Sequence, residues 1–254
     1  MWIDSHCHLN DEAFAADYEQ VLQRALAAEV ETLIVVGFDL PSSERAIELA
    51  ERHAPLRAAV GIHPHDAKTW DAAAAGRLGE LLRHPRVVAL GEIGLDYHYN
   101  YSTPDEQRHA FKEQLRMAAD YGKPVIIHDR EAHQDTLAVL QEQPLGPAGG
   151  VMHCYSGSLE TAQLFLKLGL HISFAGPLTF SNAVKLREVA AALPLAKLLV
   201  ETDSPYLTPH PWRGRRNEPG YVSLVGAKLA EIQGLPVAEV MAQTSANVKS
   251  LFGL

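Results

Sequence analysis

The stretch "RVVALGEI", residues 86–93, is an almost uninterrupted apolar run that carries a carboxylate near its end. Two similar runs are "TLIVVGF", residues 32–38, and "KLLVETD", residues 197–203. Aliphatic runs that do not alternate with polar residues are typical of strands covered on both faces, as in a parallel sheet. Residues 86–93 therefore predict a buried strand with a polar side chain at its carboxyl end.

Comparable apolar runs recur along the chain, with amphipathic segments such as residues 104–122 between them. Pro or Ser near the start and Gly near the end of these segments are typical of helices. The alternation favours an α/β fold with one domain over residues 1–254, a single closed (β/α)8 TIM barrel. An open doubly wound sheet is the alternative, although no G-x-G-x-x-G follows the first strand. The predicted strands are residues 2–8, 32–38, 57–63, 87–93, 124–128, 150–154, 170–175 and 197–203.

Composition limits the classes of function that the chain can serve. A formal net charge of -9 disfavours broad coating of nucleic acid but leaves room for a local phosphate site. We expect a cytoplasmic protein with no membrane association, because neither a secretory signal nor an apolar span is evident. No obligatory protein partner is inferred. With only 2 cysteines, reduced thiols are expected.

Polar residues stand where the predicted strands end, which in a barrel is the end that carries the active site. Side chains alternate along a strand, so His6 and His8 share one face while Cys7 faces the helix layer. By the same alternation, Cys154 beside His153 is expected to face outward. The polar residues at strand ends are His6, His8, His63, His65, Glu92, His128, His153 and Asp203.

Six of these residues are candidate metal ligands. A single histidine at a strand end is usually structural, but this many buried polar groups at one end of a barrel would lack partners without a metal. The set exceeds what one tetrahedral ion needs, so a bridging carboxylate between two ions is expected, and Glu92 is the candidate. The candidate ligands are His6, His8, Glu92, His128, His153 and Asp203. The histidines at 53, 84, 98, 109, 133, 171 and 210 are interpreted as surface or structural.

Several motifs together resemble the TatD family of metal-dependent deoxyribonucleases, within the amidohydrolase-like barrels. They are "DSHCHL" at 4–9, "GIHPH" at 61–65, "GEIGLDY" at 91–97, "HCYSG" at 153–157 and "ETDSPYLTPHPWRGRRNEP" at 201–219. The resemblance implies a binuclear divalent metal site and hydrolysis of DNA phosphodiester bonds from a 3' end. It also implies that His6, His8, Glu92 and Asp203 hold one ion, and that Glu92, His128 and His153 hold the other.

The metal remains open between Mg²⁺, Mn²⁺ and Zn²⁺. Imidazole ligands favour Zn²⁺ or Mn²⁺, whereas the family is commonly described as Mg²⁺-dependent. The hypothesis for catalysis is that a hydroxide held between the two ions attacks phosphorus in line. Asp203 would orient that water and accept its proton, and Glu92 would bridge the ions.

Other residues are assigned supporting roles, each with a structural alternative. His63, His65 and Arg130 are expected to donate hydrogen bonds to the scissile phosphate, although His65 and Arg130 could equally anchor a loop. Asp4 and Glu201 are expected to support metal-ligating residues from behind. Asp4 could instead accept from backbone donors, and Glu201 could form a structural ion pair.

The segment "PWRGRRNEPGY", residues 211–221, gathers Arg213, Arg215 and Arg216 with Trp212 and Tyr221 in an acidic chain. We interpret it as a loop that grips DNA, single-stranded or at a 3' end, and also RNA; a solvated arginine-rich loop is the structural alternative. Two other functions remain open. One is hydrolysis of lactones or phosphotriesters on the same site. Many such hydrolases resembling this chain use a carboxylated lysine as the bridge, and the predicted strand 124–128 has no lysine at its end. The other is a noncatalytic metal-binding protein.

Overall fold

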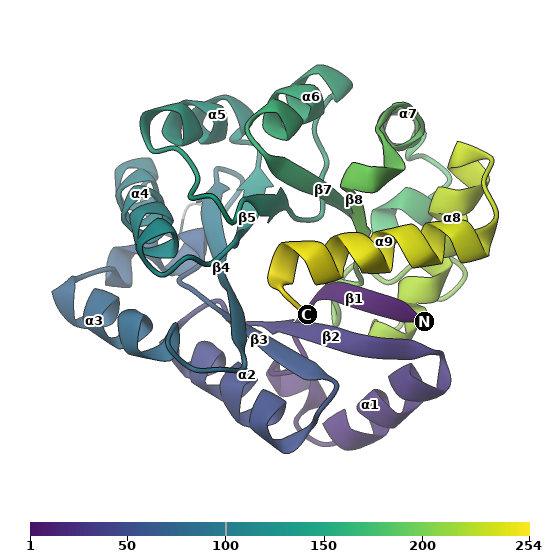
Figure 1. Ribbon diagram of the computed structural model, residues 1–254, viewed down its shortest axis with the longest axis horizontal. Helices are drawn as coiled ribbons and strands as arrows, with labels where there is room; N and C mark the ends of the chain where they lie inside the picture. Colours follow the sequence, from purple (N-terminus) through teal and green to yellow (C-terminus); the bar gives the residue numbers. More distant parts are fainter. Residues whose placement is uncertain (100) are drawn as a thin grey trace.

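The computed structural model describes residues 1–99 and 101–254, and it contains an eight-stranded parallel sheet. Neighbouring strands pair in chain order from the first to the eighth, with helices between them, so the predicted (β/α)8 barrel is confirmed (Figure 1). The strands are β1 Trp2–Cys7, β2 Val30–Val36, β3 Leu56–Val60, β4 Val87–Asp96, β5 Val125–Arg130, β6 Gly150–Met152, β7 Leu170–Phe174 and β8 Leu198–Val200.

Local chemistry sets where the outer helices begin and end. The Asp39 side chain accepts from the backbone N–H of Ser42 at the start of α2, and Thr103 and Glu106 form a capping box at the start of α4. Gly234 ends α8 in the left-handed conformation. The helices are α1 Tyr18–Ala27, α2 Leu40–Arg52, α3 Ala72–Leu81, α4 Pro104–Asp120, α5 His133–Glu142, α6 Leu159–Lys167, α7 Val184–Ala192, α8 Val222–Gln233 and α9 Val237–Phe252. None of the helices in the described residues has the length and apolar composition that a membrane crossing requires.

Two apolar clusters fill the molecule. The larger one lies between the strands and the helices, and the smaller one contains strand residues such as Ile34, Ile126 and Leu199. Phe252 and its neighbours on α9 pack into the smaller cluster, and α9 runs across one end of the barrel, near both chain termini (Figure 1). The last helix therefore closes the end of the barrel where the strands begin.

The barrel closes between β1 and the residues that follow β8. The backbone N–H of Asp203 donates to the carbonyl of His6 at 2.9 Å, and the N–H of His8 donates to the carbonyl of Ser204 at 2.8 Å. The buried Asp4 carboxylate also accepts from the backbone N–H of Thr202 at 2.9 Å. Closure thus places the first and last predicted ligand segments side by side.

Several strand boundaries differ from the predicted ones, and the difference in β4 extends a strand that carries the site. The sequence predicts an end at residue 93, but β4 continues to Asp96 because Leu95 and Asp96 pair with Asp129 and Arg130 of β5. Gly94 allows this pairing: its φ is 141°, and a Cβ there would lie 2.0 Å from the carbonyl oxygen of His128. The close approach of β4 and β5 therefore requires glycine at this position.

Replacing Asn247 with Ala is expected to lower stability without altering the opposite end of the barrel. Its side-chain amide is buried and donates to the carbonyls of Leu195 and Leu198 at 2.9 and 2.8 Å. Leaving these carbonyls unpaired should lower the free energy of unfolding by about 1–3 kcal/mol in chemical denaturation. The exposed Ser250, on the same helix, provides the control Ser250→Ala. Equal stability of the two variants would contradict the role of Asn247.

Candidate metal centre

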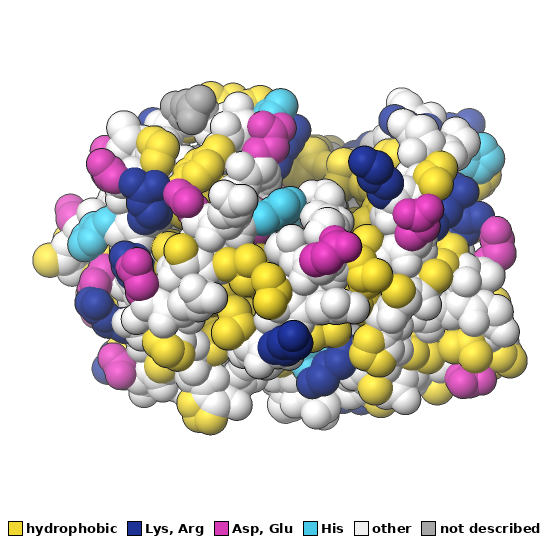
Figure 2. All heavy atoms as spheres, turned by 90° about the horizontal axis from the view of Figure 1, so that it is seen from above, with side chains coloured by type: hydrophobic (Ala, Val, Ile, Leu, Met, Phe, Trp, Pro, Cys, Tyr) yellow, Lys and Arg dark blue, Asp and Glu magenta, His cyan; other side chains and the backbone are white. Residues whose placement is uncertain are grey.

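The six predicted ligands, carried by β1, β4, β5, β6 and β8 or the residues just after them, converge at the carboxyl ends of the strands. Five of them line a cavity of about 760 Å³, and His6 is buried beside them. A hollow is visible at the upper edge of the surface between two raised parts (Figure 2). His6, His8, Glu92 and His153 are buried, while Asp203 and His128 are partly exposed. The arrangement separates into two groups of donor atoms that share Glu92.

The first group contains His6, His8, Asp203 and one oxygen of Glu92. Their atoms His6 Nε2, His8 Nε2, Asp203 Oδ1 and Glu92 Oε2 are separated by 3.1 to 3.6 Å in the five pairs measured. In a tetrahedral site with bonds of about 2.1 Å, neighbouring donor atoms lie about 3.4 Å apart. These four side chains therefore fit a divalent ion.

The second group uses the other oxygen of Glu92. Glu92 Oε1 lies 2.8 Å from His128 Nδ1 and 2.8 Å from His153 Nε2, and these two nitrogens are 3.3 Å apart. One carboxylate thus directs one oxygen toward each group, which is the geometry expected of a bridge between two ions. The division matches the ligand sets that the family resemblance implies.

Hydrogen bonds behind three of the histidines direct their lone pairs inward. His8 Nδ1 donates to the carbonyl of Val36 at 2.9 Å, and His153 Nδ1 donates to Glu201 Oε1 at 3.2 Å. His128 Nε2 donates to Asp96 at 3.0 Å. Because a neutral imidazole carries one proton, the opposite nitrogen of each ring is free to bind a cation.

Asp96, which is not among the residues predicted from the sequence, is buried and holds several parts of the site. Its carboxylate accepts from His128 Nε2 and His65 Nε2, each at 3.0 Å, and from the backbone N–H groups of His98 and Tyr99. Asp96 lies four residues after Glu92 in the "GEIGLDY" motif. It could have been predicted had the strand been extended beyond residue 93, because alternation places residues 92, 94 and 96 on one face.

The two predicted supporting carboxylates differ in their contacts. Glu201 accepts from His153 Nδ1, from the backbone N–H of Cys154 and from Ser173 Oγ, so it lies directly behind a candidate ligand. Asp4 instead accepts from Thr202 and from the backbone N–H of His6. Of the two roles considered for Asp4, its contacts match the binding of backbone donors, at the closure of the barrel.

Burial and the neighbouring imidazoles set the charge of the centre. Burial by itself raises the pKa of the Glu92 carboxyl, but the nearby histidines hold that pKa well below its usual range. For Asp203, the hydrogen bond with His8 and the charges of His6 and His153 likewise outweigh burial and lower the pKa. Both carboxylates are therefore ionised at neutral pH, as metal ligands must be.

His63 lies beside the second group, with Nε2 3.5 Å from Glu92 Oε1. Its Nδ1 accepts from the backbone N–H of His65, so the neutral ring carries its proton on Nε2. Burial lowers the pKa of His63 to about 4, which keeps the ring neutral. Although distance alone would admit His63 as a ligand, the proton on Nε2 makes it a hydrogen-bond donor toward the cavity.

The predicted phosphate-binding arginines do not share one environment. Arg130 is exposed, lines the cavity and lies over the Tyr99 ring at 4.8 Å. Arg213 and Arg215 are not among the residues that line the cavity. The Arg213 guanidinium stacks on the Phe180 ring, and the Arg215 guanidinium stacks on the Trp212 ring.

The prediction for Arg216 requires correction. Its guanidinium binds Asp17 at 2.7 Å, Glu218 at 3.3 Å and the carbonyl of Ala13 at 2.6 Å. These contacts occupy its donors, because the loop after β8 folds back against the segment before α1. Arg216 therefore anchors the loop rather than offering its charge to a substrate.

The two cysteines are free, and only one has the predicted orientation. Cys7 is buried in the cluster between strands and helices, as strand alternation predicts. Cys154, expected to face outward, instead lines the cavity. The prediction failed because β6 ends at Met152 and the φ of Cys154 is 44°, so alternation no longer applies there.

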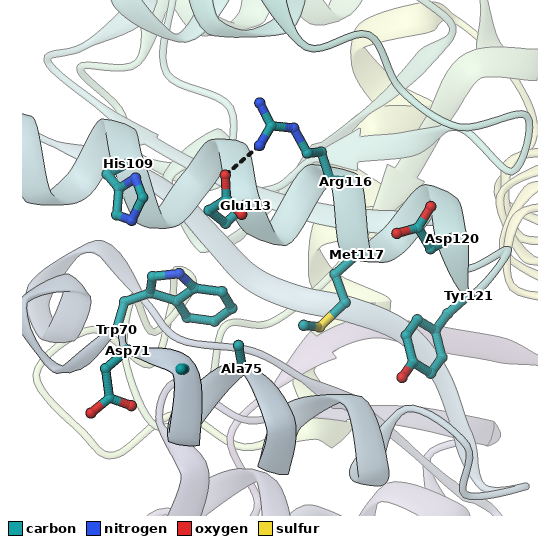
Figure 3. Close-up of a pocket in the computed structure, with 10 residues that line it drawn as sticks. Trp70, Asp71, Ala75, His109, Glu113, Arg116, Met117, Asp120 and Tyr121 are labelled. Carbon is teal, nitrogen blue, oxygen red and sulfur yellow. Dashed lines mark hydrogen bonds and ion pairs between the residues drawn. The ribbon is translucent and has the colours of Figure 1, made fainter.

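A second hollow, of about 410 Å³, lies between α3 and α4, where Trp70 and Met117 point toward each other and Tyr121 lies beyond Met117 (Figure 3). His109 and Glu113 border it, and Glu113 pairs with Arg116. Within residues 1–99 and 101–254, the groups able to hold a metal include no residue of this hollow. The candidate centre therefore lies at the barrel end.

Comparisons with known proteins agree over nearly the whole chain. The sequence model of the family described as TatD related DNase matches residues 3–253. The uncharacterized metal-dependent hydrolase YabD of Bacillus subtilis is 44% identical over 252 residues, covering 99% of each chain. The 3'-5' ssDNA/RNA exonuclease TatD of Klebsiella pneumoniae is 40% identical over 256 residues, covering 99% of this chain and 97% of the relative. The solved structure of YJJV, a TatD homologue from Escherichia coli K12, has a TM-score of 0.95 at 37% identity, covering 100% of this chain and 98% of that one.

Replacing Asp96 with Asn is expected to weaken metal binding mainly in the group that contains His128. The substitution keeps the side chain's size but removes the negative charge that orients two imidazoles, and losing such a partner typically costs about 10- to 100-fold in metal affinity. Titration calorimetry with Mn²⁺ or Zn²⁺ should show one weakened site and one nearly unchanged site. The exposed Asp105 offers the control Asp105→Asn. Unchanged affinity at both sites would rule out this role for Asp96.

Proposed function

The chain belongs to the family of TatD related DNases, and we propose that it is a metal-dependent nuclease that removes nucleotides from the 3' ends of single-stranded DNA and RNA. The family membership confirms the resemblance seen in the sequence motifs. The choice of single-stranded DNA and RNA as substrates, and of cleavage from the 3' end, rests on the relatives named as 3'-5' ssDNA/RNA exonucleases. The observation that carries the chemistry is the Glu92 carboxylate, which directs one oxygen to each of two donor groups.

Divalent ions bound at these two groups would supply Lewis-acid stabilisation of charge on the phosphate oxygens and would activate water. The protein's own residues hold the reacting groups in place. His6, His8 and Asp203 form one side of the centre, and His128 and His153 form the other. Glu92 fixes the spacing between the two sides.

Asp203 is the proposed proton acceptor. It borders the cavity, and its lowered pKa keeps it ionised at neutral pH, so it can take a proton from attacking water. Its position follows from the closure of the barrel, since its backbone N–H donates to the carbonyl of His6. The residue that accepts the proton is thus held by the same hydrogen bonds that join the first and last segments of the barrel.

His63 and Arg130 are the proposed phosphate donors. The neutral His63 ring presents an N–H group beside Glu92, and Arg130 presents its guanidinium from the cavity wall. Arg130 stacks on Tyr99, which leaves the edge of the guanidinium available for paired hydrogen bonds to phosphate oxygens. The alternative reading, a hydrolase of lactones or phosphotriesters, gains no support from the relatives named above.

Purified protein is expected to shorten end-labelled single-stranded DNA from its 3' end when Mg²⁺ or Mn²⁺ is present. A chelator, or the double substitution His6→Ala and His8→Ala, should abolish the reaction because each removes an ion from the centre. Gel analysis of 5'-labelled and 3'-labelled strands reports the polarity. His84, which pairs with Glu51 away from the cavity, offers the control His84→Ala. No metal-dependent release of nucleotides would contradict the proposal, and turnover of lactones or phosphotriesters instead would favour the alternative.

Replacing Arg130 with Ala is expected to lower kcat/KM on single-stranded DNA about 10- to 100-fold, mainly through KM, because a hydrogen bond to a charged group contributes about 1.5–3 kcal/mol. Arg216→Ala is the matched comparison, since its guanidinium is already bound by Asp17 and Glu218. Steady-state kinetics should show little change in Arg216→Ala. Equal losses in both variants would mean that general charge, rather than position, accounts for the effect.

A further inference from the structure

Exposed tyrosine side chains line the cavity. In the described part of the chain, the most exposed Tyr, Trp and Phe side chains are Tyr99, Tyr101, Tyr206 and Trp212, at 41%, 59%, 53% and 36%; the three tyrosines line the cavity and Trp212 lies outside its wall. Tyr99 and Tyr101 lie in the connection between β4 and α4, and Tyr206 and Trp212 lie in the connection between β8 and α8. Large aromatic rings lose contact with the apolar core when exposed, so their restriction to these loops indicates a binding surface.

Tyr99 and Tyr101 form a parallel stack on one wall of the cavity. Their ring centroids are 5.6 Å apart and their planes differ by only 9°. Arg130 lies over the Tyr99 ring, and the His65 ring meets Tyr101 edge-on at 4.9 Å. Tyr101 is the more exposed of the pair and is the ring available to another flat group.

Hydrogen bonds of the described residues next to the two rings connect them to the metal centre. Asp96 accepts from the backbone N–H of Tyr99, and the same carboxylate accepts from His128, a candidate ligand. Ser102 Oγ donates to the carbonyl of His65, and Lys68 Nζ donates to the carbonyl of Tyr101. These hydrogen bonds place the backbone that carries the two rings beside the donor groups.

We propose that the Tyr99–Tyr101 stack is a platform on which an unpaired base of the substrate lies, beside the metal centre. This inference rests on the proposed nuclease function. It adds that the site recognises an unpaired base of the substrate as well as its phosphate. Every nucleobase has a flat aromatic face, so the platform selects for a base that is free to stack and not for a particular sequence. A base within a duplex is already paired and stacked, and its release would cost free energy.

The proposal is tested by removing either the base or the ring. Single-stranded DNA is made with an abasic site at one position at a time near its 3' end. Affinity is measured by fluorescence anisotropy, and kcat/KM is measured with Mn²⁺. The variants are Tyr101→Leu, which removes the aromatic face, and Tyr101→Trp, which restores one. Because Tyr101 is 59% exposed, both should fold, and Leu164→Ala, at an exposed position on α6, is the control.

We expect one position at which the abasic site lowers affinity and kcat/KM about 5- to 100-fold in the unmodified protein. Tyr101→Leu should cause a similar loss on the intact strand and little further loss on that abasic strand, while Tyr101→Trp should retain most of the activity. Insensitivity to abasic sites at every position, or losses that multiply when the two changes are combined, would overturn the platform. Metal-dependent cleavage without any base dependence would overturn the platform alone. Base-dependent binding without cleavage would support the platform and overturn the nuclease function.

Discussion

The buried carboxylate of Glu92 is the constraint on which the centre depends. An ionised carboxylate without partners would be very costly to bury, so the surrounding groups must compensate its charge. Here each oxygen faces a separate group of imidazoles, and the positive charge of those imidazoles when protonated, whose place a bound cation would take, keeps the carboxyl ionised despite burial. The five strands that contribute to the site are arranged around this single side chain of β4.

The closure of the barrel and the assembly of the site use the same hydrogen bonds. His6 and Asp203 belong to segments at opposite ends of the chain, and a backbone hydrogen bond joins them directly. Asp4 adds a buried carboxylate that accepts from Thr202. A change that opened this junction would therefore separate candidate ligands as well as weaken the fold, whereas α9 stabilises the opposite end of the barrel without contacting the centre.

The carboxylates behind the ligands decide what each imidazole can do. Glu201 and Asp96 accept the outer protons of His153 and His128, which leaves lone pairs for a cation. His63 has the opposite arrangement, because a backbone N–H occupies its Nδ1. The three rings beside Glu92 thus differ in chemistry: when neutral, His128 and His153 present a lone pair to the centre, and His63 presents a proton.

The sequence by itself determined the barrel and the six candidate ligands, because strand alternation and the position of polar residues at strand ends are local patterns. It also predicted the outward direction of Cys7. The contacts of Asp96, the donor role of His63 and the occupied guanidinium of Arg216 were decided by tertiary structure, since each depends on groups supplied by a different strand or loop. Cys154 faces the cavity for a related reason: its backbone leaves the strand conformation, and a period of two predicts side-chain direction only within a strand.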